Sequence, residues 1–328
     1  MKRPCVRVAR EEGEATRSRL ADADLLDREW AIGREGDELF LPVVDPDAIP
    51  ADLEVVDHEV EPRETQTRPE DLLDFEPTYE RLGDLVLLYE EDDDRAREAA
   101  EAIVASDLTA RAVLNRASKV KGDTRVREWE ELAGNGTETV HREYGCEFVV
   151  DVARVYFSPR LATERHRVVE QVGSGERAFD MFAGVGPFAI PMAKRGAEVV
   201  ATDVNEVAIE YLEENARRNG VEERVTAICG DVREVAPDYA GWADRVVMNL
   251  PHSADEFLDV AVELAGDECT LHYYDIQHED DPFGPGEAAI REAVGEAFEV
   301  EVLNRRVVRS YAPHEVNVCL DVRLERKR

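Results

Sequence analysis

Two glycines that follow a short apolar segment have the spacing of a ligand-binding turn. Residues 177–180 resemble a strand, and Gly184 and Gly186 follow in the turn Asp-Met-Phe-Ala-Gly-Val-Gly-Pro. Because glycine has no Cβ, the backbone of such a turn can approach a ligand closely. A second strand-like segment, 197–202, ends at Asp203, about twenty residues further on, where a carboxylate can bind both ribose hydroxyls. The pattern predicts a site for an adenine nucleoside.

The same region argues against a phosphate-binding site. The turn lacks the Gly-x-Gly-x-x-Gly spacing that places a helix N-terminus under a pyrophosphate. A second acid, Asp231, follows the next strand-like segment, 224–229. Taken singly, such a turn is more often a tight connection, and such an acid more often caps a helix. Their recurrence after successive predicted strands, together with Met-Asn-Leu-Pro at 248–251, favours a site for a cationic nucleoside, S-adenosylmethionine.

The composition is strongly acidic. The 328 residues include 74 acidic and 40 basic side chains, of which only five are lysine, for a formal net charge of −34. One interpretation is a protein that avoids nucleic acid because like charges repel phosphate. The other is a halophilic protein, since a carboxylate-rich surface stays soluble in molar salt. The acids are spread along the whole chain, which favours the second interpretation and leaves an RNA substrate open.

Cysteine usage and hydropathy indicate a cytoplasmic protein. The five cysteines contain no Cys-x-x-Cys, so we expect buried thiols in a reducing compartment and no metal site. No apolar segment approaches the roughly 20 residues that span a bilayer, and no signal peptide is recognisable. We therefore expect a soluble, cytoplasmic monomer without membrane association.

The N-terminal part of the chain predicts two smaller α+β domains. Residues 1–62 form a small α/β unit, with expected strands at 5–8 and 38–43, a helix at 14–26, and a polar linker at 58–69. Residues 63–152 form a middle domain that contains the basic segment 116–128, the best candidate for contacting phosphate or a nucleobase. The elements expected there are strands at 85–89 and 112–115, a helix at 94–106, and a hairpin turning near 144–145.

Residues 153–328 alternate strands with helices, the signature of a doubly wound, Rossmann-like α/β sheet of the class I methyltransferase type. A last antiparallel pair is expected within 307–323. The helices are expected at 203–220, 253–265 and 286–298.

Five segments together resemble the archaeal and eukaryotic tRNA (guanine-37, N1) methyltransferases. They are residues 155–165, the glycine turn at 180–187, Asn-Leu-Pro-His at 249–252, Leu-His-Tyr-Tyr at 271–274, and Arg-Ser-Tyr-Ala-Pro at 309–313. The resemblance is strong over the last half of the chain and extends to the whole domain layout. It implies S-adenosylmethionine as methyl donor, tRNA with guanosine at position 37 as partner, and Mg²⁺ as an optional cofactor.

The resemblance implies a role for each matching residue. Guanine N1 carries a proton and is weakly nucleophilic, so methyl transfer needs a base, and Glu164 matches the family's general base. Arg125, near Arg127 in the basic segment, matches the arginine that stabilises charge on O6. Tyr156 would stack on or support the target base once it leaves the anticodon-loop stack. Asn249 would meet both the guanine edge and the cofactor.

The cofactor-contacting positions follow from the glycine turn and the resemblance. They are Arg165, Phe182, Gly184, Gly186, Asp203, Val204, Asp231, Val232, Asn249 and Pro251. Without the resemblance, Glu164 and Arg165 would be assigned to a solvated face of a helix starting near Pro159, and Tyr156 to an apolar core strand.

Two alternatives stay open. A related aminocarboxypropyl transferase of the wybutosine pathway uses the same cofactor on the same tRNA region, and a bifunctional methyltransferase could also act on a tricyclic wybutosine precursor. The Asn at 249 favours the methyltransferase, because the relative resembles Pro-Ser-Ser there. The second alternative is a non-catalytic RNA- or nucleoside-binding module. In the family the N-terminal domain helps check the outer corner of tRNA, although residues 1–62 are acidic for that task.

Overall fold

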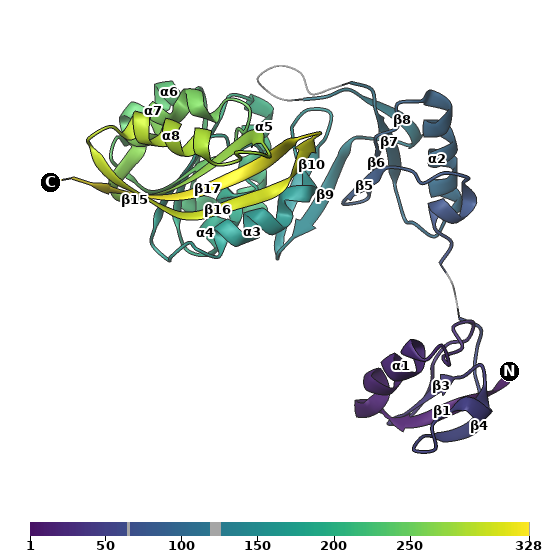
Figure 1. Cartoon of the computed structure of the whole chain (residues 1–328). Helices are drawn as coiled ribbons and strands as arrows, with labels where there is room; N and C mark the ends of the chain where they lie inside the picture. Colours follow the sequence, from purple (N-terminus) through teal and green to yellow (C-terminus); the bar gives the residue numbers. More distant parts are fainter. Residues whose placement is uncertain (64–65, 119–125, 328) are drawn as a thin grey trace. The chain divides into compact units, whose positions relative to one another are not determined.

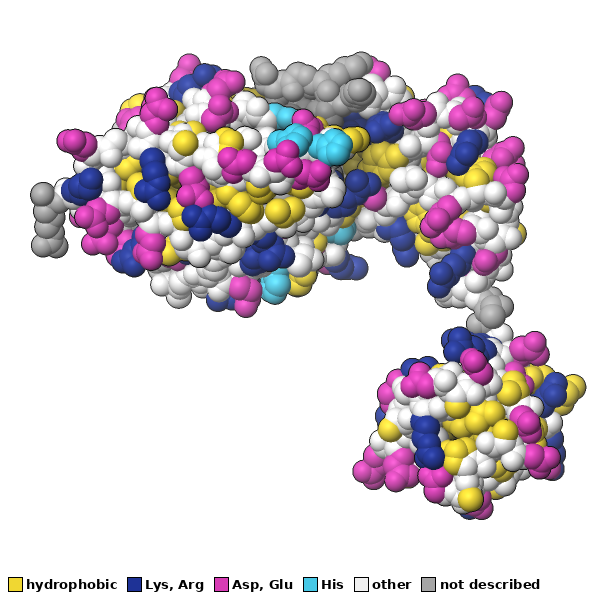
Figure 2. Space-filling model, viewed as in Figure 1, with side chains coloured by type: hydrophobic (Ala, Val, Ile, Leu, Met, Phe, Trp, Pro, Cys, Tyr) yellow, Lys and Arg dark blue, Asp and Glu magenta, His cyan; other side chains and the backbone are white. Residues whose placement is uncertain are grey.

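The computed structural model describes residues 1–63, 66–118 and 126–327. The chain divides into two compact units, Met1–Arg68 and Pro69–Arg328 (Figure 1). Acidic side chains are spread over the surface of both units (Figure 2). None of the described helices is long and apolar enough to cross a membrane.

The first unit is a four-stranded antiparallel sheet in the order β2-β3-β1-β4 with one helix. Alternating apolar residues divide between the two faces, since Val6 and Leu41 pack with Leu20 of the helix and Cys5 packs with Phe40 on the other side. The elements are β1 (Lys2–Ala9), α1 (Gly13–Asp22), β2 (Gly33–Glu35), β3 (Glu38–Pro42) and β4 (Glu54–Glu59).

The two strands and the helix predicted for this unit are confirmed, although the helix ends at Asp22. The predicted start of the linker is wrong, because His58 and Glu59 belong to β4. Polar residues dominate this edge strand, so its composition resembled a linker.

The middle segment of the second unit is a four-stranded sheet in the order β5-β6-β7-β8. Strands β6 and β7 are parallel and are connected by α2, which Asp92 caps by accepting hydrogen bonds from the backbone N–H groups of Asp94 and Arg95. The predicted strands and helix are confirmed here, while β5 and β8 were not predicted. The elements are β5 (Tyr79–Leu82), β6 (Leu85–Leu88), α2 (Asp93–Ala105), β7 (Ala112–Arg116) and β8 (Trp129–Gly134).

A β-hairpin joins the middle segment to the main sheet. Its strands are β9 (Glu138–Glu143) and β10 (Cys146–Asp151), and the predicted turn at Tyr144 and Gly145 has positive φ at both residues. The side chain of Asn215 accepts a hydrogen bond from the backbone N–H of Val149 at 2.7 Å. One apolar core continues through the hairpin into the main sheet.

The main sheet has seven strands in the order β13-β12-β11-β14-β15-β17-β16. Neighbouring strands from β13 to β15 are parallel, and β17 pairs antiparallel with both β15 and β16. The strands are β11 (Arg177–Asp180), β12 (Glu198–Asp203), β13 (Val225–Cys229), β14 (Ala243–Met248), β15 (Ala265–His278), β16 (Phe298–Ala312) and β17 (Glu315–Arg326).

Helices cover both faces of this sheet. One core cluster contains residues of α3, α4 and α5, and the other contains residues of α6, α7 and α8. The doubly wound fold and the final antiparallel pair are therefore confirmed. The helices are α3 (Ala162–Val169), α4 (Ala189–Lys194), α5 (Glu206–Arg218), α6 (Val232–Val235), α7 (Leu258–Leu264) and α8 (Gly284–Val294).

The cysteines are free thiols, as expected. Four are buried, but Cys229 is exposed at the end of edge strand β13, so the expectation of burial was wrong for this residue.

Candidate active site

The glycine turn is tied to the carboxyl ends of the two strands that flank β11. The N–H of Met181 donates to the carbonyl of Val247 on β14, and the N–H of Ala183 donates to that of Thr202 on β12. The N–H of Gly184 donates to the carboxylate of Asp203 at 2.8 Å. The structure therefore brings the predicted turn and the first predicted acid together at the edge where open parallel sheets bind ligands.

The two glycines of the turn have different tasks. Both have positive φ. At Gly184 a Cβ would meet nothing closer than the carbonyl oxygen of Tyr156, at 3.9 Å. At Gly186 a Cβ would lie 2.3 Å from the side chain of Leu212 on α5. Gly184 thus leaves space at the sheet edge, whereas Gly186 permits close packing of helices.

The acids at this edge differ in their partners. Asp203 is partly buried, and burial raises its pKa although it accepts hydrogen bonds from backbone N–H groups, including those of Gly184 and Asn205. Asp231 caps α6 and forms an ion pair with Arg233, whose hydrogen bonds lower the pKa of Asp231. Asp203 thus contacts the turn through backbone N–H groups, whereas the Asp231 carboxylate is paired with an arginine side chain.

Asp180 is an acid to which sequence reasoning gave no role. Its side chain is 1% exposed, and neither carboxylate oxygen has a hydrogen-bond partner in the described part of the chain. Burial raises its pKa to about 7, although the nearby backbone N–H groups of Phe182 and Ala189 lower it in part. An acid ending an apolar strand directly before the glycine turn was the available signal. A buried carboxylate without a partner favours a cationic ligand.

Apolar and amide groups complete this edge. The ring of Phe182 packs edge-on against Phe257, with centroids 5.0 Å apart. Val204 is 51% exposed directly after Asp203. The side-chain amide of Asn249, which follows β14, makes no hydrogen bond to the described residues. The remaining predicted positions, Val232 and Pro251, are buried.

These groups fit S-adenosylmethionine. The open turn at Gly184 can receive a nucleoside, Asp203 can accept hydrogen bonds from its ribose hydroxyls, and Asp180 can balance its positive charge. Bound there, the cofactor would supply an electrophilic methyl group on sulfur.

Glu164 lies in a buried ionic cluster. It is 3% exposed on α3 and Arg165 is 2% exposed, so neither lies on the solvated face that these residues would suggest without the resemblance. Its carboxylate accepts two hydrogen bonds from Arg167, at 2.9 and 2.6 Å, and one from the hydroxyl of Tyr274 at 3.1 Å. Arg306 on β16 forms an ion pair with it at 2.9 Å. Helix α3 packs on the antiparallel end of the sheet, which helix periodicity could not reveal.

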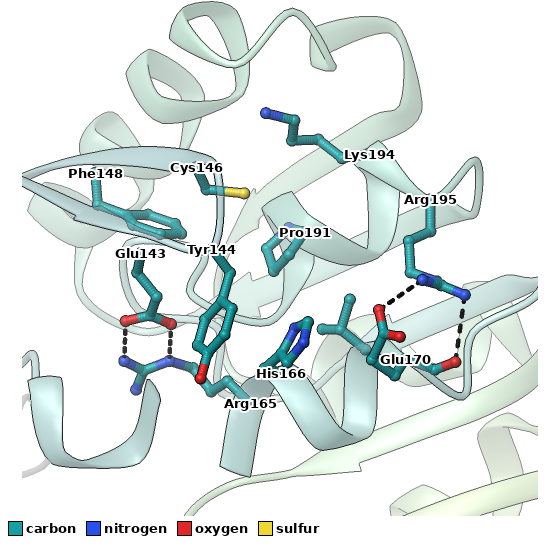
Figure 3. Close-up of a pocket in the computed structure, with 11 residues that line it drawn as sticks. Glu143, Tyr144, Cys146, Phe148, Arg165, His166, Glu170, Pro191, Lys194 and Arg195 are labelled. Carbon is teal, nitrogen blue, oxygen red and sulfur yellow. Dashed lines mark hydrogen bonds and ion pairs between the residues drawn. The ribbon is translucent and has the colours of Figure 1, made fainter. Parts of the chain in front are cut away.

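The guanidinium of Arg165 contacts the hairpin. It donates to both oxygens of Glu143, at 2.8 and 2.5 Å (Figure 3). It also donates to the carbonyl of Ser158. A small cavity lies beside this pair, where Tyr144 stacks on His166 with ring centroids 3.9 Å apart. Within the described part of the chain Arg165 contacts Glu143, Ser158 and Phe157 but no residue of the glycine turn, so its contact with the cofactor stays a prediction.

The other predicted catalytic residues are not all placed. Tyr156 lies in a loop after β10, so its assignment to a strand was wrong. It is partly buried, and its carbonyl oxygen lies 3.9 Å from the position that a Cβ on Gly184 would take. Arg125 lies outside the described residues.

Three arginines gather around Tyr89 near the start of α3. The guanidinium carbons of Arg116, Arg127 and Arg160 lie 5.8, 5.9 and 5.3 Å from its ring centroid. The ring of Trp129 lies 6.2 Å from that of Tyr89. Sequence reasoning identified the basic segment but not its association with these two rings or with Arg160, which is distant in sequence.

The doubly wound sheet, with an open glycine turn and acids at its carboxyl edge, defines a class I methyltransferase that uses S-adenosylmethionine. The chain belongs to the TRM5/TYW2 family. The TRM5/TYW2 methyltransferase domain matches residues 139–303, the tRNA methyltransferase 5 N-terminal domain residues 5–50, and the TYW2 N-terminal domain residues 65–137. The resemblance stated from the motifs is thereby confirmed.

Full-length relatives support this membership. The tRNA (guanine(37)-N(1))-methyltransferase Trm5b of Pyrococcus abyssi is 43% identical over 97% of this chain and 98% of its own. Its crystal structure has a TM-score of 0.75 and covers 98% of this chain and 99% of its own. The tRNA(Phe) (4-demethylwyosine(37)-C(7)) aminocarboxypropyltransferase of Pyrococcus horikoshii is 33% identical over 78% of this chain and 92% of its own.

Replacing Asp203 should weaken cofactor binding. We expect Asp203→Asn to reduce affinity for S-adenosylmethionine by about 10- to 100-fold, because hydrogen bonds to a charged acceptor contribute about 1.5–3 kcal/mol. Titration calorimetry measures the change. Asp244→Asn, which alters an ion pair with Arg177 in the same sheet, is the matched control. Unchanged affinity in folded Asp203→Asn would place the ribose elsewhere.

Replacing Asp180 should stabilise the cofactor-free protein in a pH-dependent way. The raised pKa means that the folded protein must lose this proton near pH 7, far above the ordinary value of 3.8. Burying the ionised carboxylate therefore lowers the free energy of unfolding by its full amount above pH 7, and by less as the pH falls from 7 toward 3.8. We expect Asp180→Asn to raise the free energy of unfolding by at most about 4 kcal/mol at pH 8 and by less at pH 5.5. Urea denaturation at both values measures this, and a gain that grows at low pH contradicts it.

Proposed function

We propose that the protein transfers the methyl group of S-adenosylmethionine to N1 of guanosine 37 in tRNA. The observation that carries this function is full-length similarity to enzymes named for that reaction, at 43% and 36% identity over 97% and 98% of this chain. The aminocarboxypropyltransferase relatives cover only 78% and 76% of it. The match to the tRNA methyltransferase 5 N-terminal domain also favours the methyltransferase.

The buried carboxylate of Glu164 supports its role as the base that accepts the N1 proton. Both of its oxygens carry hydrogen bonds or ion pairs, so one partner must yield to the guanine. Arg306 is the partner best suited to move, because its side chain is 43% exposed on the outer strand β16. Tyr274 and Arg167 are more deeply enclosed and would keep the carboxylate in place.

The target base needs groups that recognise its edge. The amide of Asn249 is suited to this, since it makes no hydrogen bond within the described chain and lies at the carboxyl end of β14. We keep Tyr156 as the support for the flipped base and Arg125 as the group that stabilises charge on O6. A neutral amide and a cation suit guanine because its O6 is an acceptor.

The arginines around Tyr89 support RNA as the substrate. They place three guanidinium groups beside two aromatic rings, and the ion pairs of Arg116 with Glu91 and of Arg160 with Glu80 leave Arg127 as the cation with no ion pair among the described residues. Arginine next to aromatic rings is suited to both phosphate contact and base stacking. A relative with a TM-score of 0.72 has been crystallised as "The complex structure of aTrm5 and tRNALeu". We propose that this protein acts on tRNA as a cytoplasmic monomer.

Replacing the proposed base should affect chemistry and not binding. We expect Glu164→Gln to reduce the single-turnover methyl-transfer rate by about 100-fold or more, with tRNA affinity within a few-fold of wild type. Glu170→Gln is the matched control, because Glu170 ends the same helix and pairs with Arg195. A near-normal rate in Glu164→Gln would remove this residue as the base.

The substrate is tested with three tRNAs that carry guanosine, adenosine or the tricyclic wybutosine precursor at position 37. S-adenosylmethionine is labelled in either the methyl or the aminocarboxypropyl carbon. We expect methyl label to enter the guanosine tRNA and adenosine to be about 10⁴-fold poorer, because its amino group mispairs with a site built for an oxygen acceptor. Aminocarboxypropyl label in the tricyclic tRNA would support the alternative enzyme. A protein that binds cofactor and tRNA without transferring either label would be a binding module.

A further inference from the structure

Arg167 is shared between two buried acids. It donates to both oxygens of Glu164 and, on its other side, to both oxygens of Asp321, where Nη2 lies 3.1 Å from Oδ1. Glu164 and Asp321 are 3% and 2% exposed. A guanidinium that donates to two carboxylates at once has little freedom to rotate.

The chain of contacts continues beyond Asp321. The Nδ1 of His272 lies 2.7 Å from Asp321, and Nε2 of the same ring meets the guanidinium of Arg245. Because arginine only donates, Nε2 accepts and the proton lies on Nδ1, which donates to Asp321. Burial lowers the pKa of His272 and keeps the ring neutral. Arg245 is itself anchored on Glu176 at 2.7 Å.

Strand register explains why these side chains meet. His272 on β15 lies opposite Asp321 on β17, and two residues further along β15, Tyr274 lies opposite Cys319. Across the next pairing, Cys319 lies opposite Arg306 on β16. Because side chains alternate between faces, both rows lie on the same face of the sheet, where α3 packs. Glu164 contacts the row with Tyr274 and Arg306, and Arg167 also reaches the row with Asp321.

The cluster of His272, Cys319 and Asp321 has ligand atoms within 4.8 Å of one another, as in a metal site. The atoms that would bind a metal nevertheless already contact arginines: Arg245 contacts the imidazole of His272, and Arg167 donates to the carboxylate of Asp321. Burial holds the pKa of the Cys319 thiol well above its usual range, so it offers no thiolate. The cluster is therefore suited to holding arginine side chains in place.

We propose that Asp321 is a positioning residue for methyl transfer, which acts through Arg167 to hold the Glu164 carboxylate in the direction of the target base. His272 and Arg245 fix Asp321 in turn. When Arg306 yields its place to guanine, Glu164 keeps its orientation because Arg167 is held from its other side. The inference rests on the proposed role of Glu164 as the base.

The test is Asp321→Asn, which has nearly the same shape and no charge. Misplacement of a reacting group by about 1 Å can cost 100-fold in rate. We expect the single-turnover rate to fall by about 10- to 100-fold, with affinities for S-adenosylmethionine and guanosine-37 tRNA within about threefold of wild type. In a Glu164→Gln background, the same change should cost less than about threefold, because the carboxylate that Asp321 positions is gone.

Asp244→Asn is the matched control, since it removes the charge from an acid that accepts two side-chain hydrogen bonds from Arg177 in the same sheet and is not part of the chain of contacts from Glu164 to Arg245. Its rate should stay within about twofold of wild type. If Asp321→Asn fails to fold, judged by lost cofactor binding, Arg167→Lys replaces it. This variant keeps the charge but cannot engage two carboxylates through a planar fork, and the same rates are expected.

The outcomes separate this inference from the proposed function. An unchanged rate in Asp321→Asn, together with a slow Glu164→Gln, overturns the positioning role alone. An equal loss with and without the Glu164 carboxylate shows a general structural effect and also overturns it. If Glu164→Gln is as fast as wild type, both the base assignment and this inference are wrong.

Discussion

The burial of the Glu164 carboxylate is the constraint on which the site depends. An ion removed from water carries a penalty of several kcal/mol unless opposite charges and hydrogen bonds surround it. Here Arg167, Arg306 and Tyr274 come from three different elements, α3, β16 and β15. The carboxylate therefore links the helix to the antiparallel end of the sheet, because its contacts with Arg306 and Tyr274 cross from α3 to β16 and β15.

The parallel and antiparallel halves of the main sheet carry different groups of the site. The parallel strands β11, β12 and β14 end at the glycine turn, Asp203 and Asn249, which suit a cationic nucleoside. The antiparallel strands β17 and β16 instead supply the polar rows beneath α3. The halves are joined at the segment after β14, where Ile276 donates to the carbonyl of Pro251 and Tyr311 hydrogen-bonds with His252 at 3.0 Å. The glycine turn and the strand residues that contact Glu164 are thus held by one continuous sheet.

Local signals predicted much of this arrangement, and long-range contacts account for what they missed. Glycine spacing and apolar segments identified β11, β12 and the turn, because those features depend on neighbouring residues. The burial of Glu164 depends on β16 and β17, more than a hundred residues away, so helix periodicity suggested a solvated face. Tyr156 resembled a strand residue because of its apolar neighbours, although it lies in a loop. Asp180 could be assigned a role only from the structure, in which both of its buried oxygens lack a hydrogen-bond partner among the described residues.

The tryptophans give the protein a set of optical probes. There are three in the sequence, and they fall in different parts: Trp30 in the first unit, Trp129 in the middle sheet and Trp242 beside the main sheet. The indole of Trp129 donates to the carbonyl of Val152 at 2.9 Å, and the guanidinium of Arg127 lies 5.7 Å from its ring. Its emission energy is consequently set by nearby charge as well as by burial. In a variant that retains Trp129 as its single tryptophan, the fluorescence would change when a ligand displaces or neutralises the guanidinium of Arg127, and no attached dye would be needed.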